Sequence, residues 1–415
     1  MVRLGRAAAL ARAAPSRVRG GNAEGPRRRP ASRYRRRDPL PPARDGQPPH
    51  PRGVEPRRHG ERPAVPGLRG QGRTGRRQDR RVTAPRVGIV LSAFAAQPAA
   101  DLVAIAREAE TRGYHAAWVG ETSGYDAVTL MTLIALSTER LQVGSAVVPV
   151  QTRTPVVLGL TAASLNHCSN DRVLLGLGLS SRIIVGDWHG LPFSNSLQQI
   201  REAVEIVRRV ASGERVTFEG AFYRVKNFRM TAPPPARPVR VVLGALGPEM
   251  LELAGEIADG VVLNWIPPEA VPASVERLQA GARKAGRTLQ GFEIASFVRT
   301  CVTDDAPAAH ATLARDITGY AIVDVYASFF RSAGYAAEVD ALNAAWRAGD
   351  RAGAVTQISP RVLAGLGVVG DEAFCRRRIA EFARAGLTQP VVLPFVPPAA
   401  PDPRAALLRT LRTFP

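Results

Sequence analysis

The 415-residue sequence has little or none of several features that define whole classes of protein. It contains no run of about 18 apolar residues, the length that a helix needs to cross a bilayer, so we do not expect an integral membrane protein. Its three cysteines, Cys168, Cys301 and Cys375, are far apart and odd in number. This argues against a disulfide framework or a zinc knuckle and favours a reducing compartment such as the cytoplasm. Only two lysines are present, Lys226 and Lys284, and neither ends a predicted buried strand, so Schiff-base chemistry is not indicated.

Positive charge is concentrated at the N-terminus. Residues 1–85 hold 23 arginines and six acidic residues, a net charge of +17, whereas the remaining 330 residues hold 33 basic and 30 acidic residues, a net charge of +3. With 13 prolines, 11 glycines and few apolar residues, this basic leader cannot bury enough surface to offset its ordering entropy, so we predict that it is disordered.

Two interpretations of the basic leader stay open. One is a translation start placed too early, in which case the true start lies near Val82 or Val87. The other is a real basic arm that binds nucleic acid by releasing counterions from the phosphates. The leader has a single aromatic residue, Tyr34, and lacks the interleaved aromatic residues of many nucleic-acid-binding segments, which disfavours the second interpretation.

From Arg86 onward the sequence alternates strand and helix signals. Eight short apolar runs are predicted strands, at residues 86–91, 115–119, 141–147, 172–175, 239–243, 261–263, 293–302 and 391–393. Helical patterns separate these runs. Repeated βα units over about 300 residues favour a (β/α)8 TIM barrel at residues 86–396, with a doubly wound open sheet as the alternative. An alternating stretch at 214–230 is predicted to be an inserted hairpin, and residues 397–415 a C-terminal tail.

In a barrel of this kind the working residues follow the strands, at their carboxyl ends. The segment 244–248 (Gly-Ala-Leu-Gly-Pro) places two glycines before a predicted helix start, where backbone N–H groups could bind an anion. Helix starts of this kind also occur without a ligand. By contrast, Gly176-x-Gly178 is a weak dinucleotide fingerprint, because Ser181 stands in place of the third glycine and no helix begins there.

Three polar residues in these loops are candidates for proton transfer or anion binding. Glu121 ends the second predicted strand, where a carboxylate could act as a base or could simply accept hydrogen bonds from nearby backbone N–H groups. Arg153 could pair with a phosphate or carboxylate tail, or could face solvent. His189 lies in the loop after the fourth strand and could move protons, or could be a structural loop residue.

No pattern of metal-ligating residues is present, so we expect no metal. The Gly-x-Ser-x-Gly pattern of hydrolases is absent too.

An ordered set of segments runs through the body of the chain. It consists of Trp-Val-x-Glu at 118–121, Gly-Ser-Ala-Val-Val-Pro at 144–149 followed by Arg-Thr-Pro at 153–155, Arg-Val-Leu-Leu-Gly-Leu-Gly at 172–178, Gly-Glu-Arg-Val-x-Phe-Glu-Gly-x-Phe-Tyr at 213–223 and Ala-Gly-Glu-Ile-Ala-Asp-Gly at 254–260. This set resembles the bacterial luciferase-like superfamily, and within it the oxidoreductases that depend on the deazaflavin coenzyme F420. The resemblance runs from Arg86 to about Pro394.

This resemblance implies an enzyme that transfers a hydride between F420 and a small organic substrate. An FMN-dependent monooxygenase is the alternative. It also implies a set of cofactor-binding residues. These are Ala146 and Val147, joined by a cis peptide bond that backs the ring, Gly178 and Ser180, which let the cofactor approach, the phosphate-binding residues Gly244, Ala245, Leu246 and Gly247, and Arg153 for the tail.

The resemblance further bears on proton transfer, the substrate pocket and assembly. In some family members a histidine follows the strand-end acid, but here that position holds Thr122. We therefore expect Glu121, together with Thr122 or His189, to carry out proton transfer. Trp188, Phe193 and Trp265 could form a wall of the substrate pocket or could be core residues. Family members are often dimers, which implies a homodimer.

Overall fold

Eight parallel strands close into a barrel in the computed structural model, which describes residues 86–194 and 196–415. The predicted basic leader lies outside the described residues. In order around the barrel, the strands are β1 (Gly88–Val90), β2 (Ala116–Val119), β3 (Gln142–Ser145), β5 (Val173–Gly178), β8 (Arg240–Gly244), β9 (Gly260–Asn264), β10 (Glu293–Val302) and β12 (Gln389–Pro394). Strand β12 pairs with β1, so the sheet closes on itself. The predicted (β/α)8 barrel is therefore confirmed, and the open sheet, which needs two edge strands, is excluded.

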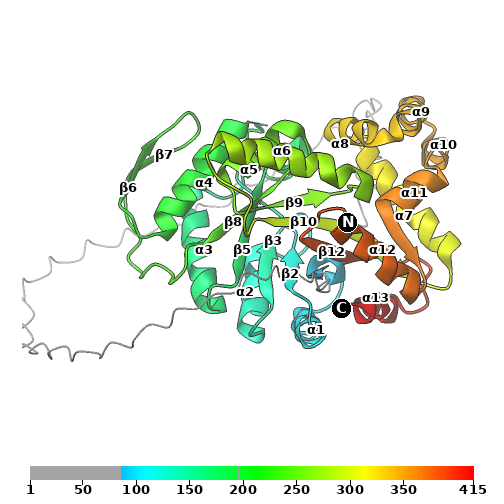
Figure 1. Cartoon of the computed structure of the whole chain (residues 1–415), viewed down its shortest axis with the longest axis horizontal. Helices are drawn as coiled ribbons and strands as arrows, with labels where there is room; N and C mark the ends of the chain where they lie inside the picture. Colours follow the sequence, from blue (N-terminus) through cyan, green and yellow to red (C-terminus); the bar gives the residue numbers. More distant parts are fainter. Residues whose placement is uncertain (1–85, 195) are drawn as a thin grey trace, which may run out of the picture. The chain divides into compact units, whose positions relative to one another are not determined.

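Helices cover the outside of this barrel (Figure 1). They are α1 (Ala99–Thr111), α2 (Ala127–Ser137), α3 (Pro155–Ser169), α4 (Leu197–Ala211), α5 (Pro248–Ile257), α6 (Val271–Lys284), α12 (Glu372–Arg384) and α13 (Pro403–Thr413), with the short helical turns η2 (Leu91–Phe94) and η4 (Pro268–Ala270). The start of α3 follows the local sequence: Pro155 occupies the first turn, and the Thr154 hydroxyl accepts a hydrogen bond from the Val157 N–H.

The structure contains an insertion between β10 and α12, where the sequence pattern predicts only a helical connection. It consists of α7 (Ala306–Ala321), α8 (Asp324–Phe330), η5 (Arg331–Tyr335), α9 (Ala336–Arg347), α10 (Arg351–Thr356), α11 (Pro360–Leu366) and β11 (Gly367–Gly370), drawn in yellow to orange in Figure 1. Strand β9 ends at Asn264, opposite Phe297, whereas β10 continues and pairs with β11 from Arg299 onward. The insertion has its own apolar core, which includes Leu313, Phe330 and Leu342.

The predicted hairpin is confirmed as β6 (Val216–Glu219) and β7 (Arg224–Phe228), an antiparallel pair at the opposite end of the molecule from the insertion (Figure 1). The carboxylate of Glu202, on α4, is buried beneath its turn. It accepts hydrogen bonds from the backbone N–H groups of Ala221, Phe222 and Tyr223 at 2.8, 2.9 and 3.1 Å. The hairpin is thus fastened to the barrel helix that precedes it.

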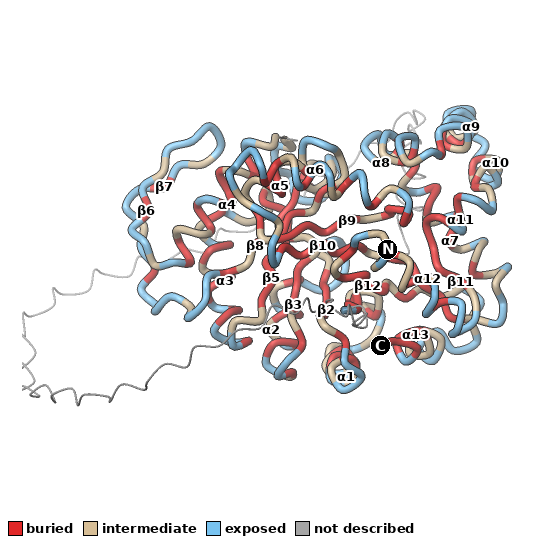
Figure 2. Tube along the Cα trace, in the orientation of Figure 1, coloured by how far each residue is buried: buried red, intermediate tan, exposed pale blue. Residues whose placement is uncertain are grey.

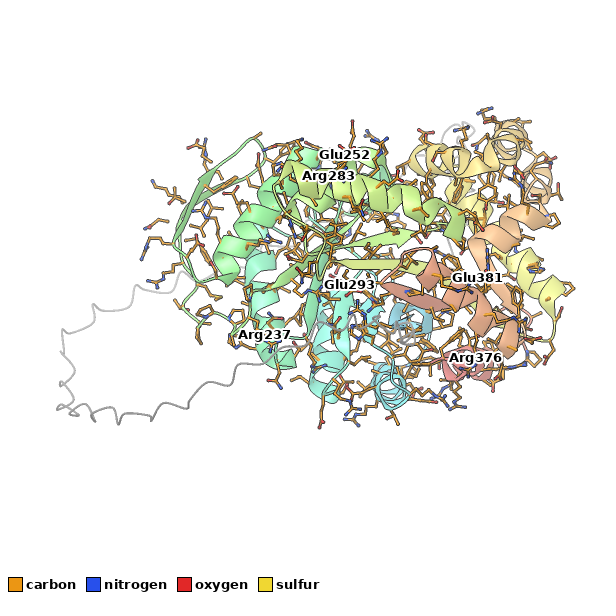
Figure 3. All side chains as sticks on the ribbon, viewed as in Figure 1. Arg237, Glu252, Arg283, Glu293, Arg376 and Glu381 are labelled. Atoms are coloured by element: carbon orange, nitrogen blue, oxygen red, sulfur yellow. The ribbon has the colours of Figure 1, made fainter. Side chains whose placement is uncertain are left out.

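The barrel strands are buried along most of their length, and the exposed surface lies on the helices, the loops and the β6–β7 hairpin (Figure 2). Trp118 fills the barrel interior, and its indole Nε1–H donates to Gln389 Oε1 at 2.6 Å. At the amino end of β10, the buried carboxylate of Glu293 (Figure 3) lies 3.4 Å from Arg86 and 3.8 Å from Arg240. The amino end of the barrel is therefore occupied by paired structural groups, which leaves the carboxyl end for chemistry.

Residues 397–415, set apart as a tail by the sequence analysis, include helix α13. Its Leu407 and Leu411, with Phe414 just after it, are buried in the same core as the barrel residues. Among the described residues, no helix is long and apolar enough to cross a bilayer.

Candidate active site

The carboxyl ends of β3, β5 and β8 meet around the side chain of Val147. The peptide bond between Ala146 and Val147 is cis, as the resemblance implies. A β-carbon placed on Gly178 would come within 2.6 Å of Val147 Cγ2, and one placed on Gly244 within 3.0 Å of Val147 Cγ1. The two glycines therefore provide the room that Val147 occupies. Three residues that the sequence analysis assigns to the cofactor thus form one surface, here called the Val147 seat (Val147, Gly178 and Gly244).

Hydrogen bonds hold the chain on either side of this seat. The Ser145 hydroxyl donates to the Gly176 carbonyl at 2.9 Å and accepts from the Gly176 N–H at 2.8 Å, which ties β3 to β5. The Ala146 N–H donates to the Val119 carbonyl on β2 at 2.8 Å. Beyond the cis peptide, the short strand β4 (Val148–Pro149) pairs with β5 again. The seat therefore belongs to the strands and not to a free loop.

The segment 244–248 connects β8 to α5. Its Ala245 N–H donates to the Val262 carbonyl at 3.2 Å, so this N–H serves the sheet. Gly247 precedes the helix and, having no side chain, does not cap it, and a β-carbon placed there would meet no atom within 4 Å. Open space therefore borders the start of a ten-residue helix with Pro248 in its first turn. An anion in that space would meet the positive end of the helix dipole.

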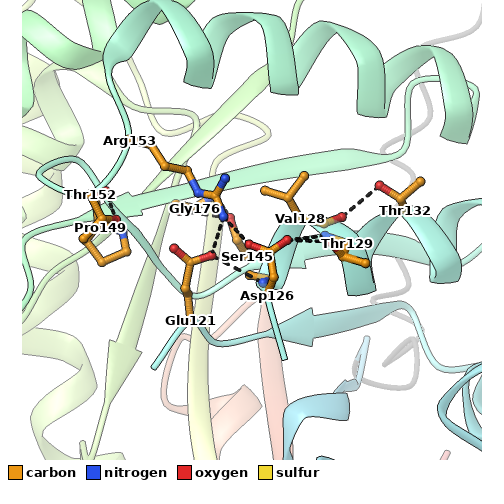
Figure 4. Close-up of polar contacts among 11 residues, drawn as sticks. Glu121, Asp126, Val128, Thr129, Thr132, Ser145, Pro149, Thr152, Arg153 and Gly176 are labelled. Atoms are coloured by element: carbon orange, nitrogen blue, oxygen red, sulfur yellow. Dashed lines mark hydrogen bonds and ion pairs between the residues drawn. The ribbon is translucent and has the colours of Figure 1, made fainter. Parts of the chain in front are cut away.

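Glu121 is paired through its Oε2 atom (Figure 4). This oxygen lies 3.1 Å from Arg153 Nη2 and accepts the Ala127 N–H at 3.3 Å. Arg153 also contacts Asp126 Oδ2, while Asp126 Oδ1 caps α2 by accepting the Thr129 N–H at 2.7 Å. Glu121 thus accepts a backbone N–H, as one of the two interpretations expects, whereas its role as a base stays a prediction. Arg153, expected to bind a cofactor tail or to face solvent, binds these two carboxylates.

The charges in this group stabilise one another. Burial acts to raise the pKa of Asp126, but its hydrogen bonds from Thr129 and the charge of Arg153 outweigh burial and lower the pKa. Burial likewise acts to lower the pKa of Arg153, but the hydrogen bond and charge of Glu121, together with Asp126, raise it. One guanidinium balances two carboxylates, so the group carries a net charge of −1 at the mouth of the barrel.

The other two candidates for proton transfer lie apart from Glu121. Thr122 is exposed, and His189 is exposed at the end of the π-helical turn η3 (Ile183–Trp188), in the loop after β5. No hydrogen bond between described residues joins either of them to Glu121. Ser180, two residues beyond Gly178, is partly buried in the same loop as His189. Among the predicted cofactor residues, Val147, Gly178 and Gly244 therefore lie together, whereas no hydrogen bond between described residues joins the three predicted proton-transfer residues.

A polar group at the ends of β9 and β10 includes a residue that the sequence analysis missed. Arg299 is buried and contacts Asn264 Oδ1, and its guanidinium carbon lies 3.6 Å from the ring centroid of Trp265. The Asn264 amide in turn donates to the Tyr326 hydroxyl at 3.0 Å. The sequence does contain a signal that could have identified Arg299. It lies at alternate positions with Ala295 and Phe297 on a long apolar strand, so it faces the barrel interior as they do. A charged residue in that register is unusual.

The aromatic residues expected to form a pocket wall differ in exposure. Trp265 is buried beneath Arg299, whereas Trp188 is exposed and Phe193 is partly buried, with Arg182 over its ring.

The described residues contain no group of three or more His, Cys, Asp or Glu side chains that could hold a metal ion. All three cysteines are free thiols. Burial raises the pKa of Cys301 to about 11 and that of Cys375 to about 12, so neither is a thiolate at neutral pH.

Comparison with known proteins finds one matching family and several similar oxidoreductases and monooxygenases. The model of the luciferase-like monooxygenase family matches residues 76–389. A Mycobacterium tuberculosis protein provisionally named as a coenzyme F420-dependent oxidoreductase is 30% identical over 327 residues, which cover 74% of this chain and 94% of that protein. The F420-dependent tetrahydromethanopterin reductase of Methanopyrus kandleri has a similar structure, with a TM-score of 0.65, 22% identity and coverage of 80% and 99% of the two chains. A monooxygenase of Streptomyces bottropensis has a similar fold, with a TM-score of 0.57, 22% identity and coverage of 79% and 97%.

Proposed function

Because this chain belongs to the luciferase-like monooxygenase family, we propose that it is an oxidoreductase that uses coenzyme F420. It would transfer a hydride between the deazaflavin ring and a small organic substrate. The names of the Mycobacterium tuberculosis and Methanopyrus kandleri proteins support the choice of cofactor. When bound, the deazaflavin supplies the ring carbon that gives or takes the hydride, and the protein contributes positioning and electrostatics.

The observation that carries this proposal is the Val147 seat. A flat ring needs a rigid surface at the mouth of the barrel, and Val147 offers one that is fixed by the close approach of Gly178 and Gly244. Hydrogen bonds from Ser145 and Ala146 hold that surface to the neighbouring strands. The residues present therefore fit a planar heterocycle, with Ala146 and Val147 behind the ring, Gly178 making room for Val147, and Ser180 in the loop at the edge of the ring.

The segment 244–247 would hold the cofactor phosphate. Because Ala245 gives its N–H to the sheet, we assign phosphate binding to the N–H groups of Leu246 and Gly247 and to the start of α5. The open space beside Gly247 supports this assignment.

Glu121 is the residue to which we assign proton transfer. Its Oε2 atom is engaged by Arg153 and Ala127, which leaves Oε1 to accept a proton from the substrate or to orient a hydroxyl. Arg153 would hold the carboxylate in one orientation. Thr122 and His189 lack hydrogen bonds to Glu121 among the described residues, so their part in proton transfer stays a prediction from the resemblance.

An FMN-dependent monooxygenase is the second candidate. The fold likeness to the Streptomyces monooxygenase supports the monooxygenase part of this candidate, and the Val147 seat fits a flavin ring as well as a deazaflavin ring. The two cofactors differ within the ring and in their response to oxygen, so a solution measurement separates them.

The test is a titration of the purified full-length chain with F420 and, separately, with FMN, followed by turnover of the reduced cofactor with and without oxygen. The proposal expects tight F420 binding and an oxygen-independent loss or gain of the F420 absorbance with a substrate. Tight FMN binding with oxygen-dependent turnover would replace it with the second candidate.

The same proposal includes a homodimer formed through α2 and α3. Large apolar side chains stay exposed on these helices, among them Leu133, Leu136 and Val157. A shallow groove of about 300 Å³ lies between the two helices and is lined by Val128, Thr132, Val157, Leu160, Thr161, Ser164, Leu165 and Cys168. A second copy of the chain would cover this face.

A further inference from the structure

Arg299 lies at the carboxyl end of β10 with its guanidinium almost fully buried, since only 2% of the residue is exposed. It lies two residues beyond Phe297, in the same inward register, and opposite Leu393 on β12. Phe297 and Leu393 line the top of the barrel interior. Arg299 therefore stands at the mouth of the barrel, on β10, whereas the Val147 seat belongs to β3, β5 and β8.

The hydrogen bonds of this guanidinium are incomplete. A guanidinium carries five N–H donors. In Arg299, Nη1 donates to Asn264 Oδ1, but Nε has no acceptor within hydrogen-bonding distance among the described residues. The carboxylate of Asp316 comes only to 3.8 Å, and 39% of that side chain is exposed. A buried cation with an unpaired donor, here Nε, is costly unless another group completes its shell.

Aromatic and polar side chains surround Arg299. Trp265 stacks on one face of the guanidinium, and the Tyr320 ring centroid lies 5.4 Å from its carbon. The Tyr320 ring meets Trp265 at 5.2 Å and Tyr326 at 4.8 Å. Asn264, Asp316, Tyr320 and Tyr326 are all partly buried, so this group of side chains reaches the surface of the molecule.

We propose that Arg299 binds an oxyanion group of the substrate, a carboxylate or a phosphate, through its Nε and a neighbouring Nη donor. A planar guanidinium matches the two oxygens of such a group in a bidentate pair. The aromatic rings limit access of water and strengthen the pair. Asp316 competes for the same donors in the absence of substrate. The assignment of the group to the substrate rests on the proposed function, whereas the anion site itself does not.

Isothermal titration calorimetry on the full-length chain without cofactor tests the anion site, with benzoate and with inorganic phosphate as separate probes. We expect at least one probe to bind, and the affinity to fall about tenfold or more in Arg299→Lys, which keeps the charge but loses the planar donor pair. Arg351→Met is the matched control, because Arg351 also stacks on an indole, 3.7 Å from the centroid of Trp346, but is exposed. Absence of binding by both probes would overturn the proposal.

Two near-isosteric variants keep the test informative if Arg299→Lys does not fold. Asp316→Asn removes the competing carboxylate and should tighten probe binding several-fold. Asn264→Asp places a carboxylate against the guanidinium and should weaken it. A purely structural Arg299 predicts no such opposite changes, so equal effects of the two variants would contradict the proposal.

Titration of F420 against Arg299→Lys separates this inference from the proposed function. An unchanged F420 affinity together with lost probe binding supports an anion group on the substrate. A matching loss of F420 affinity would assign the site to an acidic group of the cofactor and would overturn the substrate assignment. If the wild-type chain binds a probe but not F420, the proposed function fails while the anion site stands.

Discussion

At the scale of single residues, close backbone approach determines the candidate site. Val147 can occupy its position only because Gly178 and Gly244 lack side chains on the neighbouring strands. Gly178 was expected to let a cofactor approach, and in the structure it accommodates a protein side chain that would itself support the cofactor.

Gly178→Ala tests this arrangement. The added methyl group would meet Val147 Cγ2, so Val147 must move, and overpacking of this kind costs about 1–3 kcal/mol. We expect F420 affinity to fall about tenfold in a fluorescence titration. Gly319→Ala on α7 is the control, since a β-carbon there meets no atom within 4 Å. Equal F420 affinity in wild type and Gly178→Ala would show that the ring does not rest on Val147.

Glu121→Gln tests proton transfer at the same scale. The amide keeps an oxygen for the Ala127 N–H and for Arg153, but it cannot take up a proton. Loss of a general base typically lowers turnover about 10²–10⁴-fold, so we expect kcat to fall by about that factor while F420 affinity stays the same. Glu276→Gln, an exposed carboxylate on α6, serves as the control. A large loss of F420 affinity with an unchanged kcat would instead make Glu121 a binding residue.

At the scale of elements, the chain adds two units to the barrel by different means. The β6–β7 hairpin has a local signal, alternation around a Glu219-Gly220 turn, and Glu202 fastens it to α4. The insertion has no such signal. Strand β11 is four residues long and becomes a strand only because β10 extends past the end of β9 and offers it a free edge.

The Glu202 contact makes a pH-dependent prediction. Burial acts to raise its pKa, but hydrogen bonds from Phe222, Gln198, Ala221 and Tyr223 outweigh burial and lower it below its ordinary value of 4.5. A lowered folded-state pKa stabilises the fold above the unfolded-state value, and this contribution is lost as the pH falls through the folded-state pKa. Glu202→Gln should therefore cost about 1–3 kcal/mol of unfolding free energy at pH 7, and less at or below pH of about 4.

Thermal unfolding of Glu202→Gln at both pH values measures this difference. Glu205→Gln provides the control on the same helix, since Glu205 is half exposed and pairs only with the neighbouring Arg209 among the described residues. A Tm difference that is the same at both pH values would show that the carboxylate charge of Glu202 does not stabilise the hairpin.

At the scale of the whole molecule, apolar side chains are exposed on one part of the outer surface, on helices α2 and α3. Helix α2 is apolar on nearly all sides, which is typical of a helix covered by a partner, yet Leu136 is 67% exposed in the single chain. The proposed homodimer would bury this face.

Sedimentation equilibrium tests the dimer. The full-length wild-type chain should sediment as a dimer, and Leu136→Glu should raise the dissociation constant about 100-fold or more by placing a charge in an apolar interface. Val325→Glu on α8 alters a similarly exposed apolar side chain outside the interface and should leave the dimer intact. A wild-type chain that stays monomeric at high concentration would contradict the proposal.

The eight barrel strands, the hairpin and most barrel helices could be predicted from the sequence. The signals for them, apolar periodicity and turn residues, lie within each element or at its ends. The sequence also located the segments of the Val147 seat, through their resemblance to a family. Tertiary structure alone decided the partners of these residues. Arg153 meets Glu121 and Asp126, and Arg299 meets Asn264 and Trp265, only after the barrel closes and brings strand ends together. Such pairs leave no periodic trace along the chain, since the contact depends on strand order and register and not on local composition.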